Sequence, residues 1–369
     1  MSSKRVCGRG QASAAVLLLG CFLATFLGVE VAGAATGYYA LDDAAITIKN
    51  PGQTPLVAVT RAGQTLVSVG LHGVIVTSQD NGESWIQANV PVDVTLTSVY
   101  FENDRQGWAV GHYGVVLSTQ DGGRNWTREQ SGLDVIAALV AEANREQTVV
   151  PPPETAAKMQ RVAQVFQAAG PSKPFLAVGS CGHGILAAGQ QDMAVLSNDN
   201  GKSWNEWTSK IDNPHYSNIY GIFNHDGQTF LVGENGMVLS GDAGCENFKS
   251  LTPPLDETLF GGMAVNEDDL LVYGLTGGVF KSEDYGKTWT SLVIPTDANV
   301  TSGLVLPSGN VLLGTLGGEL YLGDKQIDHF SRLPMKEPFQ IAGMALAPNG
   351  AVVVVGDIGA KIIPPGAVQ

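Results

Sequence analysis

Charged residues, and basic residues above all, are scarce in this 369-residue chain. Only 15% of its residues are charged, and 21 Lys and Arg face 35 Asp and Glu, which gives a formal net charge of −14. So few basic residues cannot build the positive surface that binds nucleic-acid phosphates or anionic lipid headgroups. The composition therefore argues against nucleic acid as a partner and is compatible with basic or neutral partners.

Long apolar runs are absent beyond the N-terminus, so the sequence predicts no transmembrane segment in the mature chain. Residues 1–34 have the pattern of a secretory signal peptide: a basic start, an apolar stretch from Ala14 to Val29, and the cleavage motif Ala32-Gly-Ala34. Alternatives are a retained membrane anchor and a lipoprotein attached at Cys21. We expect cleavage near Ala34 and an exported, periplasmic product.

Glycine, in contrast, is abundant, with 46 residues, and it marks a repeat. Five stretches share a hydroxyl residue, an Asp two places later, a Gly two further on and then an aromatic residue, a pattern called the Asp box. Their Asp and aromatic residues are Asp80 and Trp85, Asp121 and Trp126, Asp199 and Trp204, Asp242 and Phe248, and Asp284 and Trp289. Recurrence at roughly 40 residues is typical of propellers and other repeat folds.

A Gly-x-x-Gly turn between two apolar runs precedes the boxes. It lies at 70–73, 111–114, 233–236, 274–277, 314–317 and 356–359, and Gly189-Gln-Gln-Asp192 takes the same place in the third unit. Two residues between strand-like runs predict a β-hairpin. Each of the seven units therefore reads as four short antiparallel strands, and together they predict an all-β fold: a seven-bladed β-propeller formed by residues 35–369 as a single domain.

The last unit lacks a fourth strand and an Asp box. Residues 44–48 are strand-like and otherwise unpartnered, so we expect them to pair with the last blade as its outer strand and close the ring. The alternative is a loose N-terminal arm.

The pattern breaks at residues 134–169, between the second and third units. Apolar residues recur there at helical spacing on both sides of Pro151-Pro-Pro153, which predicts two helices. Because this insertion joins a fourth strand to a first strand, we expect it on the face of the Gly-x-x-Gly turns, beside or over the mouth of the central channel. It could bind a partner or only pack against a blade.

Two cysteines follow the signal segment, Cys181 and Cys245. The blade pattern places them in turns on the same face of neighbouring blades, so a disulfide and two free thiols are both open.

The Asp-box carboxylates are expected to be structural, because Asp in a Gly-bearing turn accepts hydrogen bonds from nearby backbone N–H groups. His72 and His112 fall in adjacent turns, but no third ligand accompanies them, so no metal is predicted, and no cofactor. Sialidases also contain Asp boxes, yet they need a Tyr nucleophile and an arginine cluster, and the arginines here are few and dispersed. We expect no enzyme activity; a sialidase-like glycoside hydrolase or a glycan-binding propeller is the alternative.

The fullest repeat, from Thr97 to Trp126, resembles that of the photosystem II stability/assembly factor family, which includes relatives in non-photosynthetic bacteria. The resemblance covers residues 38–363 and implies a seven-bladed propeller that binds a protein partner, in the thylakoid lumen if the host is photosynthetic. On this basis we expect a monomeric, non-catalytic scaffold for a subunit of a membrane complex. The expected contacts are the insertion and the turns at the channel mouth: His72, His112, Tyr113, Gln190, Gln191, Glu234, Asn235 and Asp357.

Overall fold

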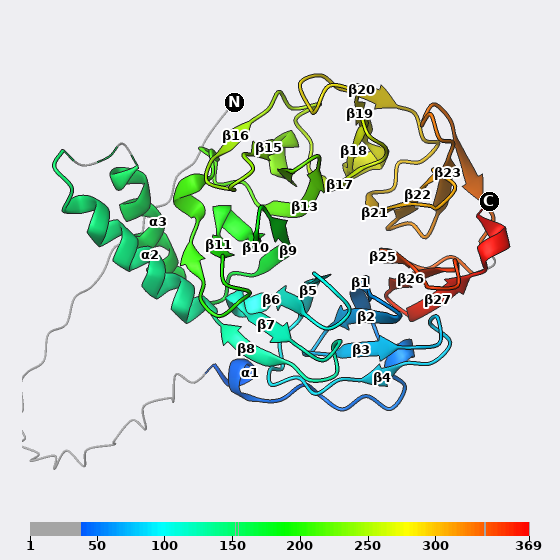
Figure 1. Ribbon diagram of the computed structural model, residues 1–369, viewed down its shortest axis with the longest axis horizontal. Helices are drawn as coiled ribbons and strands as arrows, with labels where there is room; N and C mark the ends of the chain where they lie inside the picture. The colour runs from blue at the N-terminus through cyan, green and yellow to red at the C-terminus, as the bar shows by residue number, and fades with distance from the viewer. Residues whose placement is uncertain (1–37, 152, 154, 336, 369) are drawn as a thin grey trace, which may run out of the picture. The chain divides into compact units, whose positions relative to one another are not determined.

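Seven antiparallel sheets follow one another around a ring in the computed structural model, which describes residues 38–368 apart from 152, 154 and 336 (Figure 1). The predicted signal segment, with Cys21, lies outside the described residues. Six sheets have four strands and the last has three. This confirms the predicted seven-bladed propeller.

The strands of blades one to three are β1 Leu56–Ala62, β2 Thr65–Gly70, β3 Ile75–Ser78, β4 Ile86–Gln87, β5 Leu96–Phe101, β6 Gly107–Gly111, β7 Val116–Thr119, β8 Thr127–Gln130, β9 Phe175–Cys181, β10 Gly184–Gly189, β11 Ala194–Ser197 and β12 Asn205–Glu206. Those of blades four and five are β13 Ile219–His225, β14 Gln228–Gly233, β15 Val238–Gly241, β16 Phe248–Ser250, β17 Leu259–Ala264, β18 Leu270–Gly274, β19 Val279–Ser282 and β20 Thr290–Leu292. Blades six and seven contain β21 Val300–Val305, β22 Val311–Thr315, β23 Leu320–Gly323, β24 Phe330–Leu333, β25 Ile341–Leu346, β26 Val352–Gly356 and β27 Gly359–Ile363.

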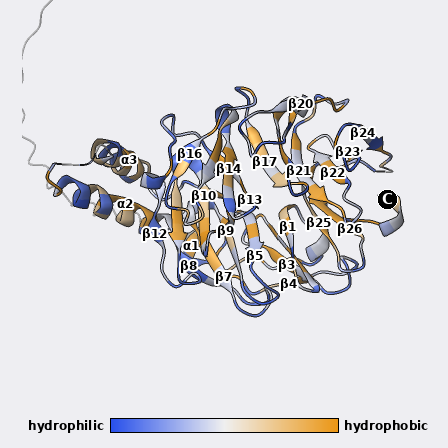
Figure 2. Cartoon of the chain, turned by 45° about the horizontal axis from the view of Figure 1, so that its top comes forward, coloured by the Kyte–Doolittle hydropathy of each residue, from blue (hydrophilic) through white to orange (hydrophobic). Residues whose placement is uncertain are grey.

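The second strand of each blade forms the centre of the core. Strand β26 (Val352–Gly356) is buried along its whole length, and β6 and β18 share this pattern. Both faces of such a strand pack against a neighbouring blade, which explains why these runs are continuously apolar instead of alternating with polar residues. Figure 2 shows the hydrophobic residues concentrated in the strands and the hydrophilic ones in the loops.

The ring closes differently from the prediction. Residues 44–48 form no strand, and the seventh sheet contains only β25, β26 and β27. The segment instead lies along the outer strand of blade one, where Gln87 Oε1 accepts a 2.8 Å hydrogen bond from the Ile48 N–H. The expected clasp is therefore wrong, because the side chain of Gln87 occupies the hydrogen-bonding groups of this segment.

Blades one and seven meet through packing. Strand β1 packs against β25, and a short 3₁₀ turn, η1 (Pro51–Gln53), packs against β27. A Cβ atom on Gly359 would lie 2.2 Å from the carbonyl oxygen of Gly52, so the two segments approach as closely as glycine allows. Apolar side chains of the two blades form one shared cluster between them.

The Asp boxes are turn-forming devices, as expected. In blade one, the Ser78 hydroxyl donates to Asp80 Oδ1 at 2.8 Å and accepts from the Gly82 N–H at 2.8 Å, while the Ser84 N–H donates to Asp80 Oδ1 at 2.9 Å. The indole N–H of Trp85 donates to the Gly82 carbonyl at 3.0 Å. The same hydroxyl–Asp–Gly bonds recur in the second, third and fifth blades. The hydroxyl and backbone N–H of Ser203 lower the pKa of Asp199 to about 2.

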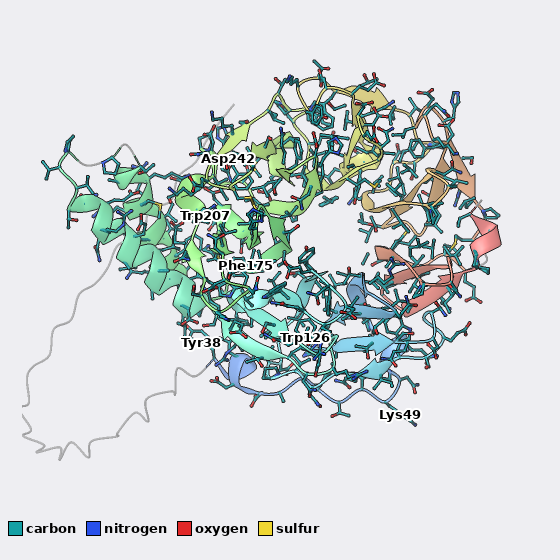
Figure 3. The ribbon with its side chains drawn as sticks, viewed as in Figure 1. Tyr38, Lys49, Trp126, Phe175, Trp207 and Asp242 are labelled. Carbon is teal, nitrogen blue, oxygen red and sulfur yellow. A yellow bond between two sulfur atoms is a disulfide. The ribbon has the colours of Figure 1, made fainter. Side chains whose placement is uncertain are left out.

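The altered box of blade four takes part in a disulfide. Cys181, at the end of β9, is bonded to Cys245, and their Cα atoms are 5.8 Å apart. Both side chains are buried, and the indole N–H of Trp207, labelled in Figure 3, donates to the Cys245 carbonyl at 2.6 Å. The bond links blades three and four.

The predicted insertion forms two helices, α2 (Gly132–Gln147) and α3 (Ala156–Ala169), and a short α1 (Tyr39–Asp42) precedes blade one. Ser131 and Asp134 cap α2 reciprocally, which fixes its start. Buried apolar residues of both helices, among them Leu139, Met159 and Phe166, join a cluster with blades two and three. Figure 1 shows the pair at the outer edge of the ring, so it does not cover the channel.

Candidate functional site: the turn face and helix α3

The seven turns between second and third strands leave the same end of every blade and so form one face, here called the turn face. The first strands of neighbouring blades pack against each other around the centre, as β1 does on β5 and β13 on β17. The turns therefore lie further out than the predicted channel mouth, midway along each blade. In blade six the turn is Thr315 to Gly318, one residue later than predicted: the Thr315 N–H donates to Glu319 O, as the Gly70 N–H does to Val74 O.

Four of the predicted contact residues remain in separate turns. His72 pairs with Asp93, with 2.9 Å between Nδ1 and Oδ1. Tyr113 packs against Tyr38 at 6.1 Å between ring centroids, and His112 beside it is exposed. Asp357 accepts a 3.1 Å hydrogen bond from the Gln340 N–H. These contacts tie each turn to a neighbouring loop without bringing the four together.

Three of the other predicted residues, Gln191, Glu234 and Asn235, are brought together by the loop that joins blades three and four, whereas the Gln190 N–H donates to the Pro174 carbonyl. Asn218 accepts a bond from the Gln191 N–H at 2.8 Å, and its own N–H donates to Glu234 Oε2 at 2.9 Å. The amide of Asn235 donates to the Ser217 hydroxyl at 2.9 Å. The turns of blades three and four are thus held in a fixed relation.

Asp192 stands where the other turns of the repeat have glycine, and its side chain explains how α3 is attached to the ring. It has a φ of 68°, the left-handed conformation that its counterparts Gly114 (59°) and Gly236 (67°) also adopt. Its side chain is fully buried; Lys158 of α3 donates to Oδ2 at 3.1 Å and Asn213 donates to Oδ1 at 3.1 Å. Burial raises the pKa of Asp192 to about 7, and Lys158 works in the opposite direction. In this turn an aspartate replaces the glycine of the other turns, and helix α3 supplies the cation that pairs with it.

A groove lies between α3 and these loops. It has a volume of about 360 Å³ and is lined by Arg161, Val162, Val165, Phe166, Gln191, His215 and Tyr216. Val165 is 51% exposed although it is a large apolar residue. A second hollow of about 350 Å³ shares His215 and continues to Glu234 and Asn235. The two together, here called the α3 groove, offer an apolar wall with polar groups at both ends.

Lys173 supplies a buried cation beside the α3 groove. Only 9% of this residue is exposed, and burial lowers the pKa of its ammonium group. Its Nζ donates to Gln191 Oε1 and lies 5.0 Å from the centroid of the Phe166 ring, and both of these residues line the groove. Among the described residues it forms no salt bridge. The apolar residues that line the groove therefore suit an apolar segment, and Lys173 lies behind them.

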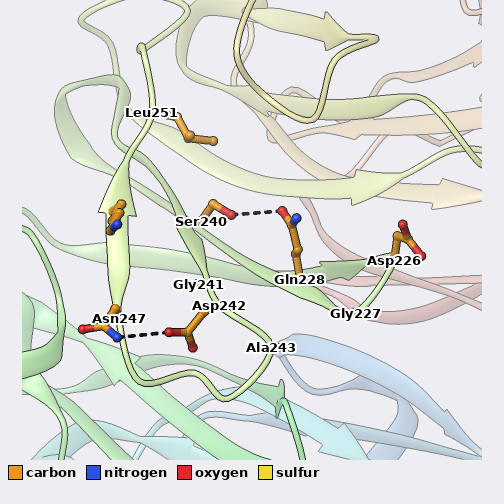
Figure 4. A pocket seen from close by; sticks show the side chains of 10 residues that line it. Asp226, Gly227, Gln228, Ser240, Gly241, Asp242, Ala243, Asn247 and Leu251 are labelled. Atoms are coloured by element: carbon orange, nitrogen blue, oxygen red, sulfur yellow. Dashed lines mark hydrogen bonds between the residues drawn. The ribbon is translucent and has the colours of Figure 1, made fainter.

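A larger hollow, of about 850 Å³, lies beside the altered Asp box of blade four (Figure 4). It is wide open, and four of its polar side chains bond in pairs: Ser240 donates to Gln228 at 3.2 Å and Asn247 to Asp242 at 3.1 Å. Because these groups already have partners, we assign no site there.

In the part of the chain that the structure describes, Arg105 and Arg124 line one hollow of about 360 Å³ together with Asp104 and Asp121. No group of three or more His, Cys, Asp or Glu residues could hold a metal ion in this part of the chain. Arg145 pairs with Glu142 and Arg332 with Glu319, while Arg161 lies at the α3 groove. Within the same residues, no helix is long and apolar enough to cross a membrane.

The fold, the Asp boxes and the turn face together define the protein as a seven-bladed propeller of the Asp-box class. Residues 39–144, which span blades one and two and most of α2, match the family model described as photosynthesis system II assembly factor YCF48. The chain is therefore similar to the photosystem II assembly factor family, as the repeat at Thr97 to Trp126 predicts.

Solved structures agree on the fold. The structure described as YCF48 bound to D1 peptide is 14% identical, with a TM-score of 0.61 over 87% of this chain and 96% of that one. YCF48 from Cyanidioschyzon merolae is 12% identical, with a TM-score of 0.61 over 86% and 97%. The WD40 β-propeller domain of Doa1 is 9% identical, with a TM-score of 0.59 over 88% and 96%. None of the curated proteins compared matches the sequence. At these identities the likeness establishes the fold alone.

Several features around the α3 groove have no clear signal in the sequence. The repeat predicts the turn that contains Asp192, but its partner Lys158 is far from it in sequence. The 212–218 loop contains no motif. The one available signal was an aspartate where the other turns have glycine.

Proposed function

We propose that this protein is an exported, non-catalytic scaffold that binds a protein partner, a subunit of a membrane complex, at the α3 groove and the adjoining turns. The observation that supports this most is the groove itself. It presents an exposed apolar residue, Val165, on a rigid frame of hydrogen bonds, and the buried cation Lys173 lies behind it, bonded to the lining residue Gln191.

Two further observations favour a protein partner. The family model that matches residues 39–144 is that of an assembly factor, and one similar structure is a YCF48 with a D1 peptide bound. We extend peptide binding, and not the identity of that peptide, to this chain.

The test is a crosslinking pull-down from native membranes with the mature, tagged protein, followed by mass spectrometry. Val165→Asp places a charge in the groove without disturbing the core, because the side chain is half exposed. Ile86→Asp, at a 72% exposed position on β4, is the matched control. We expect a reproducible membrane-complex subunit with the parent protein and the control, and its loss with Val165→Asp. Recovery of glycoconjugates alone, or turnover in a glycoside panel, would overturn the proposal.

A further inference from the structure

The turn face is divided into two arcs of different chemistry. In blades two, three and four the first residue after the glycine is His112, Gln190 or Glu234, and the second is also aromatic or polar. Blades five, six and one instead have an aliphatic residue at this first position, Leu275, Leu316 and Leu71, whereas blade seven has Asp357 there and the aliphatic Ile358 at the second position. These four aliphatic residues are here called the aliphatic arc. These four blades are consecutive in the ring, since β17 packs on β21, β21 on β25 and β25 on β1 (Figure 1).

Three members of the arc are clearly exposed: Leu71 is 39% accessible, Leu316 42% and Ile358 46%. The turn itself does not require a leucine. The N–H of Leu316 donates to Asn299 O and that of Leu275 to Thr258 O, just as the N–H of His112 donates to Thr95 O. The same backbone position therefore accepts a polar residue in the other arc. Exposed aliphatic residues that repeat without a structural need mark a contact surface.

The border of the arc is acidic. Glu257, Asp297 and Asp357 are exposed in the loops and turns of these blades and form no salt bridge among the described residues. Arg332, which lines the hollow beside the blade-six turn, already pairs with Glu319 at 3.1 Å. An acidic border repels anionic lipid headgroups. It also disfavours a symmetric dimer through this surface, because each copy would bring the same acidic border against the other.

We infer that the aliphatic arc docks an apolar, basic-flanked segment of a partner protein, with its aliphatic side chains on the arc and its Lys or Arg residues against the acidic border. This inference rests on the proposed function and adds the kind of segment recognised. A hollow of about 310 Å³ lies beside the blade-six turn and could accept one large side chain: its apolar wall is Leu333, Pro334, Met335 and Pro338, and Gly318 and the paired Glu319 and Arg332 complete the lining.

The test uses the whole mature protein and a fluorescent model helix made of Leu and Lys, with a Leu–Glu helix of equal length as the charge control. Leu71→Gln combined with Leu316→Gln removes two exposed members of the arc. His112→Gln, at the equivalent position of a polar-arc turn, is the matched control. We expect the Leu–Lys helix to bind the parent protein, at least about ten-fold weaker binding to the double variant, about 1.4 kcal/mol, and unchanged binding to His112→Gln.

Three results would overturn the inference. The Leu–Lys helix could bind the parent and the double variant equally, or the Leu–Glu helix could bind the parent protein as tightly as the Leu–Lys helix does. In the third, the double variant changes self-association or binding to phosphatidylcholine vesicles but not binding of the helix. Both variant proteins are checked for an unchanged melting temperature, and Leu71→Ser with Leu316→Ser replaces the pair if it unfolds. The membrane partner could be captured in a way that Val165→Asp abolishes and the double variant of the arc does not. That result would support the proposed function and contradict this inference alone.

Discussion

Replacing Lys158 with methionine tests how the helical insertion is attached to the ring. The substitution keeps the length of the side chain and removes its charge. Lys158 Nζ lies 3.1 Å from Asp192 Oδ2 and also donates to the Ile211 carbonyl at 3.2 Å. In the variant, Asp192 keeps only its bond from Asn213 and remains fully buried.

The expected loss of stability depends on pH. Burial raises the pKa of Asp192 to about 7 with Lys158 present, and removal of the lysine raises that pKa further. The unfolded chain has an aspartate pKa of about 3.9, so the folded state binds the extra proton and stability falls as pH rises through this window. Above the folded pKa, an unpaired buried carboxylate costs about 3–5 kcal/mol. Near pH 5 the carboxyl is protonated, and only a hydrogen bond of about 1 kcal/mol is lost.

Urea denaturation at about pH 5 and about pH 8.5 measures this difference. The double variant Lys158→Met with Asp192→Asn is the control, because it keeps the shape and removes both charges. We expect Lys158→Met to be much less stable than the parent only at the higher pH, and the double variant to recover most of the loss there. Equal destabilisation at both pH values would refute this account of the attachment.

Three further predictions concern stability. Phe166→Ala should lower the free energy of unfolding by about 3–5 kcal/mol, measured by urea denaturation, since this side chain is 3% exposed; a loss below about 1 kcal/mol would contradict its place in the core. Reduction of the Cys181–Cys245 bond, whose cysteines are 64 residues apart in sequence, should lower the free energy of unfolding by about 4 kcal/mol. Dithiothreitol should therefore lower the melting temperature of the parent protein but not that of a Cys181→Ser/Cys245→Ser variant. Gly201→Ala should lose at least about 1–3 kcal/mol, because φ is +82° and a Cβ would lie 2.4 Å from Trp108 Nε1; an unchanged melting temperature would argue against this packing.

The repeat made the blades predictable. A Gly-x-x-Gly turn and an Asp box are local chemistry, so their positions indicated the strands and their number. The helices of the insertion followed from apolar spacing in the same way. In blade six, however, the pattern predicts Gly314 as the start of the turn, whereas Thr315 occupies that position. Adjacent glycines at 317 and 318 made the register ambiguous in the sequence.

Ring closure and the site could not be predicted in the same way, because they depend on contacts between distant residues. A strand-like composition at 44–48 says nothing about which edge is available, and Gln87 binds this segment to blade one. Likewise, position in the repeat predicts which residues lie in the turns but not which of them are in contact. The structure unites Gln191, Glu234 and Asn235 through the 217–218 loop and leaves His72 and Asp357 apart.

The central claim, a protein-binding scaffold that uses the α3 groove, is tested most directly by a photo-crosslinking amino acid at position 165. The same amino acid at position 86, on the outer strand of blade one, is the control. In native membranes we expect one membrane-complex subunit to crosslink from position 165 and not from position 86. Crosslinking of the same proteins from both positions, or of no protein from position 165, would contradict the account.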